Sequence, residues 1–232
     1  MYRYIFMTIV GLMSCSHMMN IENTSPDTTE VSRKFSYIAL GDSYTIGHDL
    51  PASSSFPLLL EKKLLSDGYE QEKKTKIIAK TGWSCDDLSK NISLSSIENN
   101  SYNLVTLLIG VNDQYRNIDI KYYPERFTTL INEAIRICGD KKKVVILSIP
   151  DYSVTPFGNN SLKIAKEIAE YNNINKTISI ELGIKYIDIT PISLKAKDDL
   201  TYLANDKLHP SEKMYAEWVN EMYPSVKSAL GN

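Results

Sequence analysis

The sequence predicts a three-layer α/β domain built on a mostly parallel sheet. Two observations lead to this fold class: short apolar runs alternate with longer stretches of helical periodicity, and the most apolar runs contain almost no polar residue. Continuous apolar runs are typical of strands buried on both faces of a parallel sheet. The 232 residues allow one sizeable domain, and neither an internal repeat nor a second domain boundary is visible.

Each strand and helix is predicted from its hydrophobic pattern and from the residues at which it begins or ends. Gly68 suits the end of a first helix, Ser84 and Asp87 form a weak capping box at a second, and Pro124 suits the first turn of a third. The order of strands and helices alternates, as in α/β domains. The expected strands are residues 35–40, 76–79, 104–109, 144–149 and 184–187, and the expected helices are residues 56–66, a segment from Cys85, 124–137, 162–182 and 211–230.

The sequence Gly41-Asp42-Ser43-Tyr44 follows the first expected strand. Ligands bind at the carboxyl ends of parallel strands, and a strand-to-loop turn lifts a serine clear of the sheet. Ser43 is therefore a candidate nucleophile. On these four residues alone, a turn with a capping serine is the better interpretation, and the G-x-S-x-G elbow of the α/β-hydrolases is absent.

A nucleophilic serine needs a base that accepts its proton, and the chain has only three histidines. His17 falls in a polar N-terminal stretch and His48 follows the serine closely, which leaves His209 in Asp206-Lys207-Leu208-His209 as the best base. The Asp206 carboxylate, three residues earlier, can fix the imidazole tautomer. The competing interpretation of His209 is a surface histidine at the start of the last helix.

Two further strand ends carry candidate oxyanion donors. Asn112 follows the third expected strand in Gly110-Val111-Asn112-Asp113, where its amide can donate to a developing oxyanion. Gly82 ends the second strand, and its N–H can point into the same cleft. Each residue is also interpretable as an ordinary turn residue.

Taken in chain order, the motifs that contain Ser43, Gly82, Asn112 and the pair Asp206 and His209 resemble those of the SGNH hydrolases, the GDSL-type esterase-lipase family. The resemblance extends from about Phe35 to the C-terminus. Tyr44 replaces the leucine of the GDSL name. The resemblance implies a flavodoxin-like α/β/α fold and ester hydrolysis without a metal or cofactor. It also implies catalytic roles for Ser43, Asp206 and His209, and an oxyanion hole formed by Ser43, Gly82 and Asn112.

Several neighbouring residues are candidates for the substrate pocket. Tyr44, Gln114 and Tyr115 are the expected substrate-binding residues, and His48 and Arg116 also follow strand ends. The loop at residues 150–158 follows the fourth expected strand, and such loops often determine specificity. An ordinary surface loop is the alternative.

We expect a serine esterase that hydrolyses small acyl or O-acetyl esters, carbohydrate esters included, through an acyl-enzyme on Ser43. The open alternatives are a lysophospholipase, thioesterase or acyltransferase of the same fold, or a lipid-anchored binding protein without catalysis. The formal net charge of −2 gives no basic footprint for nucleic acid. We expect a monomer.

The first residues predict a bacterial lipoprotein signal. The apolar run at residues 4–13 is too short to span a bilayer but fits the core of a secretory signal. Leu12-Met13-Ser14-Cys15 resembles a lipoprotein cleavage box, although Met13 departs from the usual small residue. We expect a signal peptide at residues 1–14, a lipidated Cys15 with a flexible tether at 15–33, and the hydrolase domain at 34–232. The protein is then anchored in the bacterial cell envelope, in the periplasm or outer membrane, with secretion as the alternative.

Cys85 and Cys138 remain once Cys15 is assigned to lipid. An oxidising compartment would allow them to pair. We favour unpaired thiols, with Cys138 as a small core residue on a helix and Cys85 in a loop.

Overall fold

The computed structural model describes residues 1, 2, 4 and 33–231. The chain divides into two compact units, Met1–Val31 and Ser32–Asn232, and the second contains all the helices and strands that are described. Nearly all of the expected signal peptide and of the tether, with the proposed lipidation site Cys15 and His17, lie outside the described residues. Within the described part, no helix has the length and apolar character needed to cross a membrane.

Five strands form one sheet in the order β2-β1-β3-β4-β5, and every neighbouring pair is parallel. This confirms the predicted fold class. The order matches the flavodoxin-like arrangement of doubly wound sheets. The strands are β1 (Lys34–Gly41), β2 (Glu70–Ala79), β3 (Leu104–Leu108), β4 (Val144–Leu147) and β5 (Lys185–Ile187).

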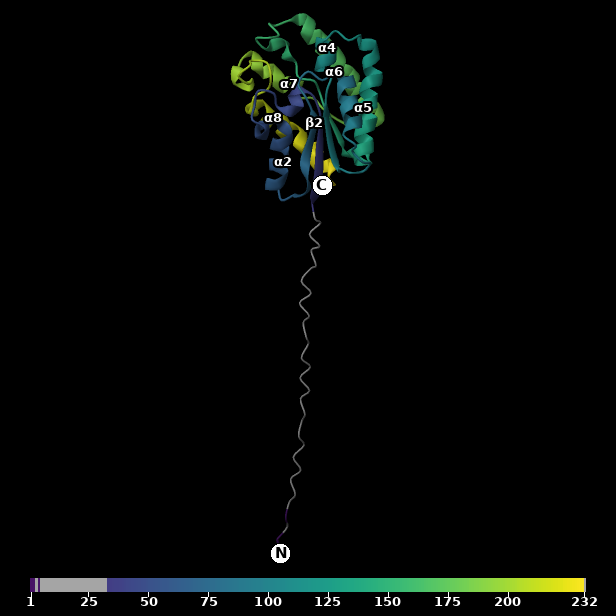
Figure 1. The fold of residues 1–232 in the computed structure, drawn as a ribbon. Coiled ribbons are helices and arrows are strands. Elements are labelled where there is room, and N and C mark those ends of the chain that lie inside the picture. Colours follow the sequence, from purple (N-terminus) through teal and green to yellow (C-terminus); the bar gives the residue numbers. More distant parts are fainter. Residues whose placement is uncertain (3, 5–32, 232) are drawn as a thin grey trace. The chain divides into compact units, whose positions relative to one another are not determined.

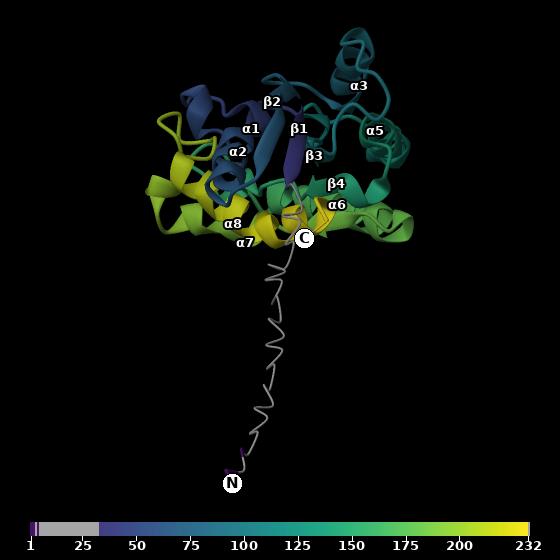
Figure 2. The ribbon, with the colours of Figure 1, turned by 90° about the horizontal axis from the view of Figure 1, so that it is seen from below.

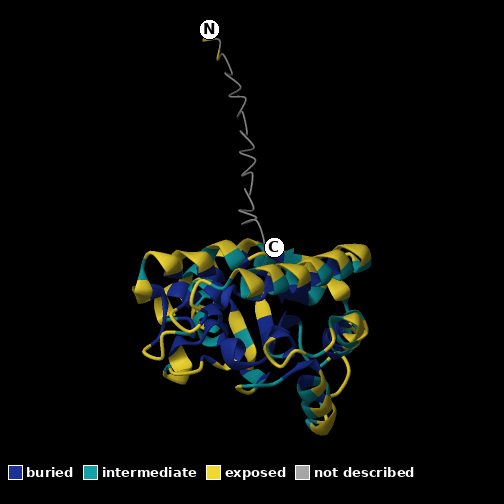
Figure 3. Ribbon diagram, turned by 90° about the horizontal axis from the view of Figure 1, so that it is seen from above, coloured by how far each residue is buried: buried dark blue, intermediate teal, exposed yellow. Residues whose placement is uncertain are grey.

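The helices cover both faces of this sheet. Helix α2 packs on α8, while α5 contacts both α3 and α6, and these two groups lie on opposite faces (Figures 1 and 2). Buried residues gather between the layers, whereas exposed residues lie on the outer sides of the helices (Figure 3). The longer helices are α2 (Phe56–Ser66), α3 (Cys85–Leu94), α5 (Tyr123–Cys138), α6 (Leu162–Leu182) and α8 (Glu212–Ala229).

Three short helices were not expected from the sequence: α1 (Ser43–Ile46), α4 (Val111–Tyr115) and α7 (Thr190–Ser193). Helices of four or five residues are too short to show a 3.6-residue periodicity. Two of them matter for function, because α1 begins immediately beyond β1 and α4 begins shortly after β3. They therefore fix the backbone at the carboxyl edge of the sheet.

Strand β2 begins at Glu70, six residues before the predicted start at Lys76. Its first half is polar because β2 is an edge strand, so the side chains there remain largely exposed. An apolar run therefore marks only the half of the strand that packs into the core. The capping box of Ser84 and Asp87 is present as predicted.

Cys85 and Cys138 are free and buried. Cys85 is the first residue of α3, where the sequence predicted a helix to begin, and it is 1% exposed, so the description of Cys85 as a loop thiol is wrong. Its backbone N–H donates to Asp113 Oδ2 at 2.9 Å. Cys138 lies at the end of α5, as expected.

Candidate active site

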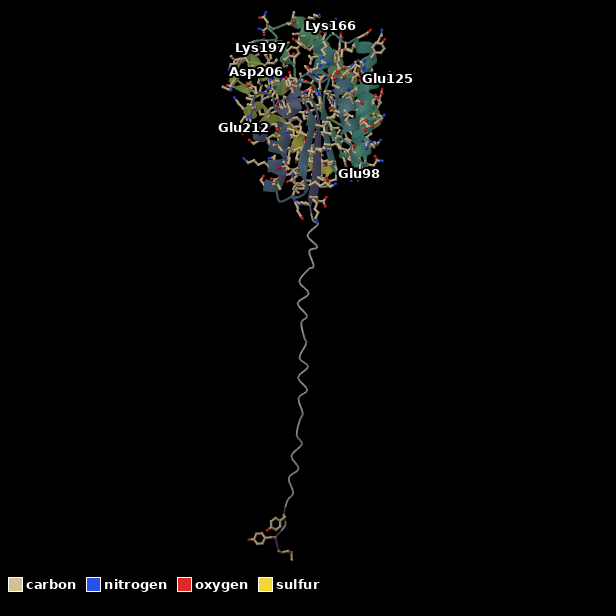
Figure 4. The ribbon with its side chains drawn as sticks, in the orientation of Figure 1. Glu98, Glu125, Lys166, Lys197, Asp206 and Glu212 are labelled. Carbon is tan, nitrogen blue, oxygen red and sulfur yellow. The ribbon has the colours of Figure 1, made fainter. Side chains whose placement is uncertain are left out.

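The candidate site lies where the strand order reverses. Strand β1 sits between β2 and β3, and the connections that follow β1 and β3 run to opposite faces of the sheet, which opens a crevice at the carboxyl ends. Ser43 follows β1, Gly82 follows β2 and Asn112 follows β3. Figure 4 places Asp206 toward the end of the domain away from Glu98, which precedes β3.

A cavity of about 320 Å³ lies at this edge. It brings together the proposed nucleophile, the proposed base and the proposed oxyanion donors, although these come from distant parts of the sequence. The lining residues are Ser43, Tyr44, Thr81, Gly82, Val111, Asn112, Tyr115, Tyr152, Phe157, Leu208 and His209.

The turn that carries Ser43 is fixed by close backbone packing. A Cβ at Gly41 would collide with the Leu108 carbonyl and the Thr45 side chain, so β1 can end here only with glycine. The Asp42 carboxylate caps α1 by accepting the Tyr44 N–H at 3.0 Å. Ser43 is consequently the first residue of α1, and its N–H has no partner within the helix.

The Asp206 carboxylate is held in position by three hydrogen bonds. Its Oδ2 lies 2.6 Å from His209 Nδ1, and its Oδ1 accepts the N–H groups of Leu208 and His209, each at 2.9 Å. Lys207 adopts a left-handed conformation (φ 60°), which turns the chain so that the carboxylate faces the ring. The loop is closed at its base, where the Ala204 N–H donates to the His209 carbonyl at 2.8 Å.

The protonation states of this pair suit a general base. Burial lowers the pKa of His209 below its ordinary 6.5, and this outweighs the raising effect of Asp206. Burial acts to raise the pKa of Asp206, but hydrogen bonds from His209 and from the backbone bring that pKa below its usual value. His209 is therefore neutral and Asp206 ionised near pH 7.

Burial raises the pKa of Asp42 to about 8, against the hydrogen bond from the Tyr44 N–H. The carboxyl group next to the proposed nucleophile is therefore mostly neutral at pH 7. A buried anion here would repel the negative charge that develops on a carbonyl oxygen under attack. The neutral form of Asp42 removes this repulsion.

Three N–H groups at the cavity are available to an oxyanion. Within the described residues, the Ser43 and Gly82 backbone N–H groups donate to no other residue. The Asn112 side-chain amide donates to the Trp83 carbonyl at 3.0 Å, which leaves its second N–H free. Arg116 donates to the Gly82 carbonyl, which holds the backbone on the C-terminal side of Gly82.

The expected substrate-binding residues are only partly at the cavity. Tyr44 and Tyr115 line it, but Gln114 does not. The Gln114 amide donates to Glu167 at 2.7 Å and accepts the Tyr152 hydroxyl at 2.9 Å. Gln114 therefore positions a tyrosine that lines the cavity.

For the remaining residues near the site, the sequence indicated only that they follow strand ends. Arg116 donates to the Gly82 carbonyl and forms an ion pair with Asp87 at 3.0 Å. His48 is not a lining residue, but its Nδ1 hydrogen-bonds Thr81, which lines the cavity. The loop at residues 150–158 contributes Tyr152 and Phe157. Sequence reasoning gave no role to three lining residues, each of which is next to a residue that it did assign: Thr81, Val111 and Leu208.

Residues 39–217 match the model of the GDSL-like lipase/acylhydrolase family. The chain belongs to this family. The resemblance of its motifs to the SGNH hydrolases is thereby confirmed, and this GDSL hydrolase is a serine hydrolase that acts on ester bonds. No curated protein matches the sequence significantly.

Solved structures share the fold of the GDSL hydrolase at low sequence identity. The psychrotrophic esterase EstA from Pseudoalteromonas sp. is 18% identical with a TM-score of 0.64, over 86% of this chain and 100% of that one. The acetyl xylan esterase AlAXEase is also 18% identical with a TM-score of 0.64, over 83% and 99%. The lipase/acylhydrolase from Enterococcus faecalis is 21% identical with a TM-score of 0.63, over 84% and 96%.

Proposed function

We propose that this GDSL hydrolase is an esterase that cleaves small acyl or O-acetyl esters, carbohydrate esters among them, through an acyl-enzyme on Ser43. One observation carries the proposal: Ser43, His209, Gly82 and Asn112 line a single cavity, and Asp206 is bonded to the far side of the His209 ring. Two of the similar structures are described as esterases, one of them an acetyl xylan esterase.

In the proposed mechanism, His209 Nε2 takes the proton from the Ser43 hydroxyl as Oγ attacks the ester carbonyl carbon. The Ser43 and Gly82 N–H groups and the Asn112 amide stabilise the oxyanion. His209 then protonates the leaving alcohol, and water repeats the sequence to release the acid. No hydrogen bond joins Ser43 Oγ to His209 in the described structure, and such bonds often form only when substrate closes the site.

Two exposed aromatic side chains support a carbohydrate substrate. Tyr115 and Phe157 are 57% and 54% exposed, and their ring centroids lie 6.1 Å apart at the cavity. Exposed apolar side chains that lie together often mark a ligand-binding groove. Their flat apolar faces suit the C–H face of a sugar ring, while the small cavity takes the acyl group.

The test compares three substrate classes on one preparation: acetylated sugars, short chromogenic acyl esters and lysophospholipids. We expect the highest kcat/KM on acetylated sugars, and labelling of Ser43 by a fluorophosphonate. Preference for lysophospholipids would favour the lysophospholipase alternative. Absence of both turnover and labelling would indicate a binding protein, and transfer of the acetyl group to a second sugar would indicate an acyltransferase.

Replacing Asn112 with alanine should lower kcat by about 100- to 1,000-fold with little change in KM, because the oxyanion exists only in the transition state and the intermediate. Steady-state kinetics would measure this effect. The substitution also removes the bond to the Trp83 carbonyl, so the melting temperature must be measured on the same preparation. Normal kcat with a large loss of stability would mean that Asn112 only forms the turn.

Activity should persist below pH 6.5 and fall only as the pH passes through the lowered pKa of His209. The sign follows from the mechanism: His209 accepts a proton, so it acts in its neutral form, and burial extends that form to lower pH. The profile of kcat/KM against pH would check this. An acidic limb centred above pH 6.5 would contradict it.

We further propose that Cys15 carries lipid and anchors the protein in the bacterial cell envelope. The motivation is the apolar run that ends in Leu12-Met13-Ser14-Cys15. Metabolic labelling with a fatty-acid analogue should label the wild-type chain and leave Cys15→Ser unlabelled and outside the membrane fraction. Equal labelling of the two chains would contradict lipidation at this residue.

A further inference from the structure

His48 joins the proposed catalytic pair, Asp206 and His209, in a group of side chains of the kinds that bind metal ions. One nitrogen or oxygen donor atom from each of His48, Asp206 and His209 lies within 4.8 Å of the others. His48 is exposed on the loop after α1, and its ring centroid is 4.5 Å from that of His209. The catalytic scheme uses Asp206 and His209 but gives no role to His48.

The hydrogen bonds leave the same nitrogen free on both rings. His48 Nδ1 bonds the Thr81 hydroxyl at 2.9 Å, and His209 Nδ1 bonds Asp206 at 2.6 Å. The His209 Nε2 therefore carries the lone pair of the neutral ring, and the His48 Nε2 does so in the tautomer in which Nδ1 donates to the Thr81 hydroxyl. A histidine that binds a metal through one nitrogen almost always has the other nitrogen fixed in this way by a carboxylate or another polar group.

We propose that His48 and His209 bind a divalent transition-metal ion, with Zn²⁺ the best fit, through their Nε2 atoms, and that this ion reversibly inhibits the esterase. Imidazole nitrogen is a preferred ligand of zinc, whereas Mg²⁺ and Ca²⁺ prefer oxygen. The inhibitory part rests on the proposed function, in which His209 is the base. Water completes the coordination of the ion.

Zinc binding requires the two imidazoles to move closer together. Zinc–nitrogen bonds of about 2.0–2.1 Å in a tetrahedral site place two nitrogens about 3.4 Å apart, and one ring nitrogen of His48 lies within 4.8 Å of one ring nitrogen of His209. His209 is held by its loop, so His48 has to move. The His48 side chain is exposed, so its ring can tilt about the hydrogen bond between Nδ1 and Thr81 and bring Nε2 toward His209.

The surrounding charge favours a cation. The Asp206 carboxylate lies 2.6 Å from His209 Nδ1, and the Asp49 carboxylate accepts the Asp206 N–H at 2.9 Å. Two carboxylates thus lie close to the two imidazoles. Negative charge close to the site stabilises a divalent ion that is bound there.

Inhibition follows from competition for one lone pair. The Nε2 lone pair of His209 that would accept the Ser43 proton is the pair that binds the metal. The metal-bound enzyme therefore has no base, although Asp206 keeps its bond to Nδ1. Removing the ion with a chelator restores the lone pair and should restore activity.

The test measures Zn²⁺ binding by calorimetry and inhibition by ester hydrolysis, on wild type and His48→Gln. We expect one site with a Kd below about 1 mM, at least about 10-fold weaker in His48→Gln, because loss of even an outer-shell partner costs that much. The inhibitory concentration should rise by a similar factor. Glu98→Gln, at the far end of the domain (Figure 4), should bind as wild type does, and Mg²⁺ should neither bind nor inhibit.

The outcomes separate the two proposals. Equal Zn²⁺ affinity in wild type and His48→Gln, or no binding at millimolar Zn²⁺, would overturn the metal site whatever the enzyme hydrolyses. Binding that depends on His48 in a chain without esterase activity would leave the metal site standing and overturn the proposed function. Calorimetry on Ser43→Ala should give the wild-type affinity, because binding requires no turnover.

Discussion

Replacing Ser43 with alanine should lower the kcat for ester hydrolysis by about 10⁶-fold, the loss that follows removal of the nucleophile from a serine hydrolase. The residual rate would come from the oxyanion donors and from substrate binding alone. Turnover of a chromogenic ester and labelling by a fluorophosphonate would measure the effect. Unchanged turnover would remove Ser43 as the nucleophile.

The fold should survive this substitution. The Ser43 hydroxyl forms no hydrogen bond within the described residues, so alanine leaves no buried partner unsatisfied. Ser54 offers a matched control, because it is 8% exposed and its hydroxyl donates to Glu212 at 2.7 Å, outside the cavity. Ser54→Ala should lower the melting temperature and leave kcat unchanged, which is the opposite pattern.

The fold was predictable where long elements have strong periodicity. Helices α2 and α6 begin and end at the predicted residues, and the apolar runs marked β1, β3 and β4 within two residues at each end. The sequence did not reveal the first half of β2 or the short helices α1 and α4. Edge strands need no apolar run, and a single helical turn has no period to detect.

The site residues that come directly after strands could be predicted from the sequence. Ser43, Gly82 and Asn112 each follow a strand, and parallel strands bring such residues to one edge. The position of Phe157 at the cavity depends on loop packing, which leaves no periodic signal. The Gln114 side chain is directed away from the cavity by its hydrogen bond to Glu167, a contact between residues far apart in the sequence. The contact of His48 with His209 joins segments far apart in the sequence and needed three-dimensional coordinates.

Replacing Asp206 with asparagine should lower kcat by about 10⁴-fold while the domain stays folded. The Asn side-chain oxygen can still accept the Leu208 and His209 N–H groups that Asp206 Oδ1 accepts. Its NH₂ group then faces His209 Nδ1, where a carboxylate oxygen stood. A donor at this position forces the ring proton onto Nε2, so His209 can no longer accept the Ser43 proton.

Two measurements distinguish this tautomer effect from simple damage to the loop. Imidazole ¹⁵N chemical shifts should show the His209 proton moving from Nδ1 to Nε2 in Asp206→Asn. Asp206→Ala removes the acceptors for both backbone N–H groups, so it should destabilise the domain more than Asp206→Asn does. If Asp206→Asn kept near-normal kcat while Asp206→Ala lost stability, Asp206 would serve to shape the loop, and another group would have to orient His209. The 2.6 Å contact between Asp206 Oδ2 and His209 Nδ1 favours the first outcome, because the described structure places no other carboxylate in hydrogen-bond contact with that nitrogen.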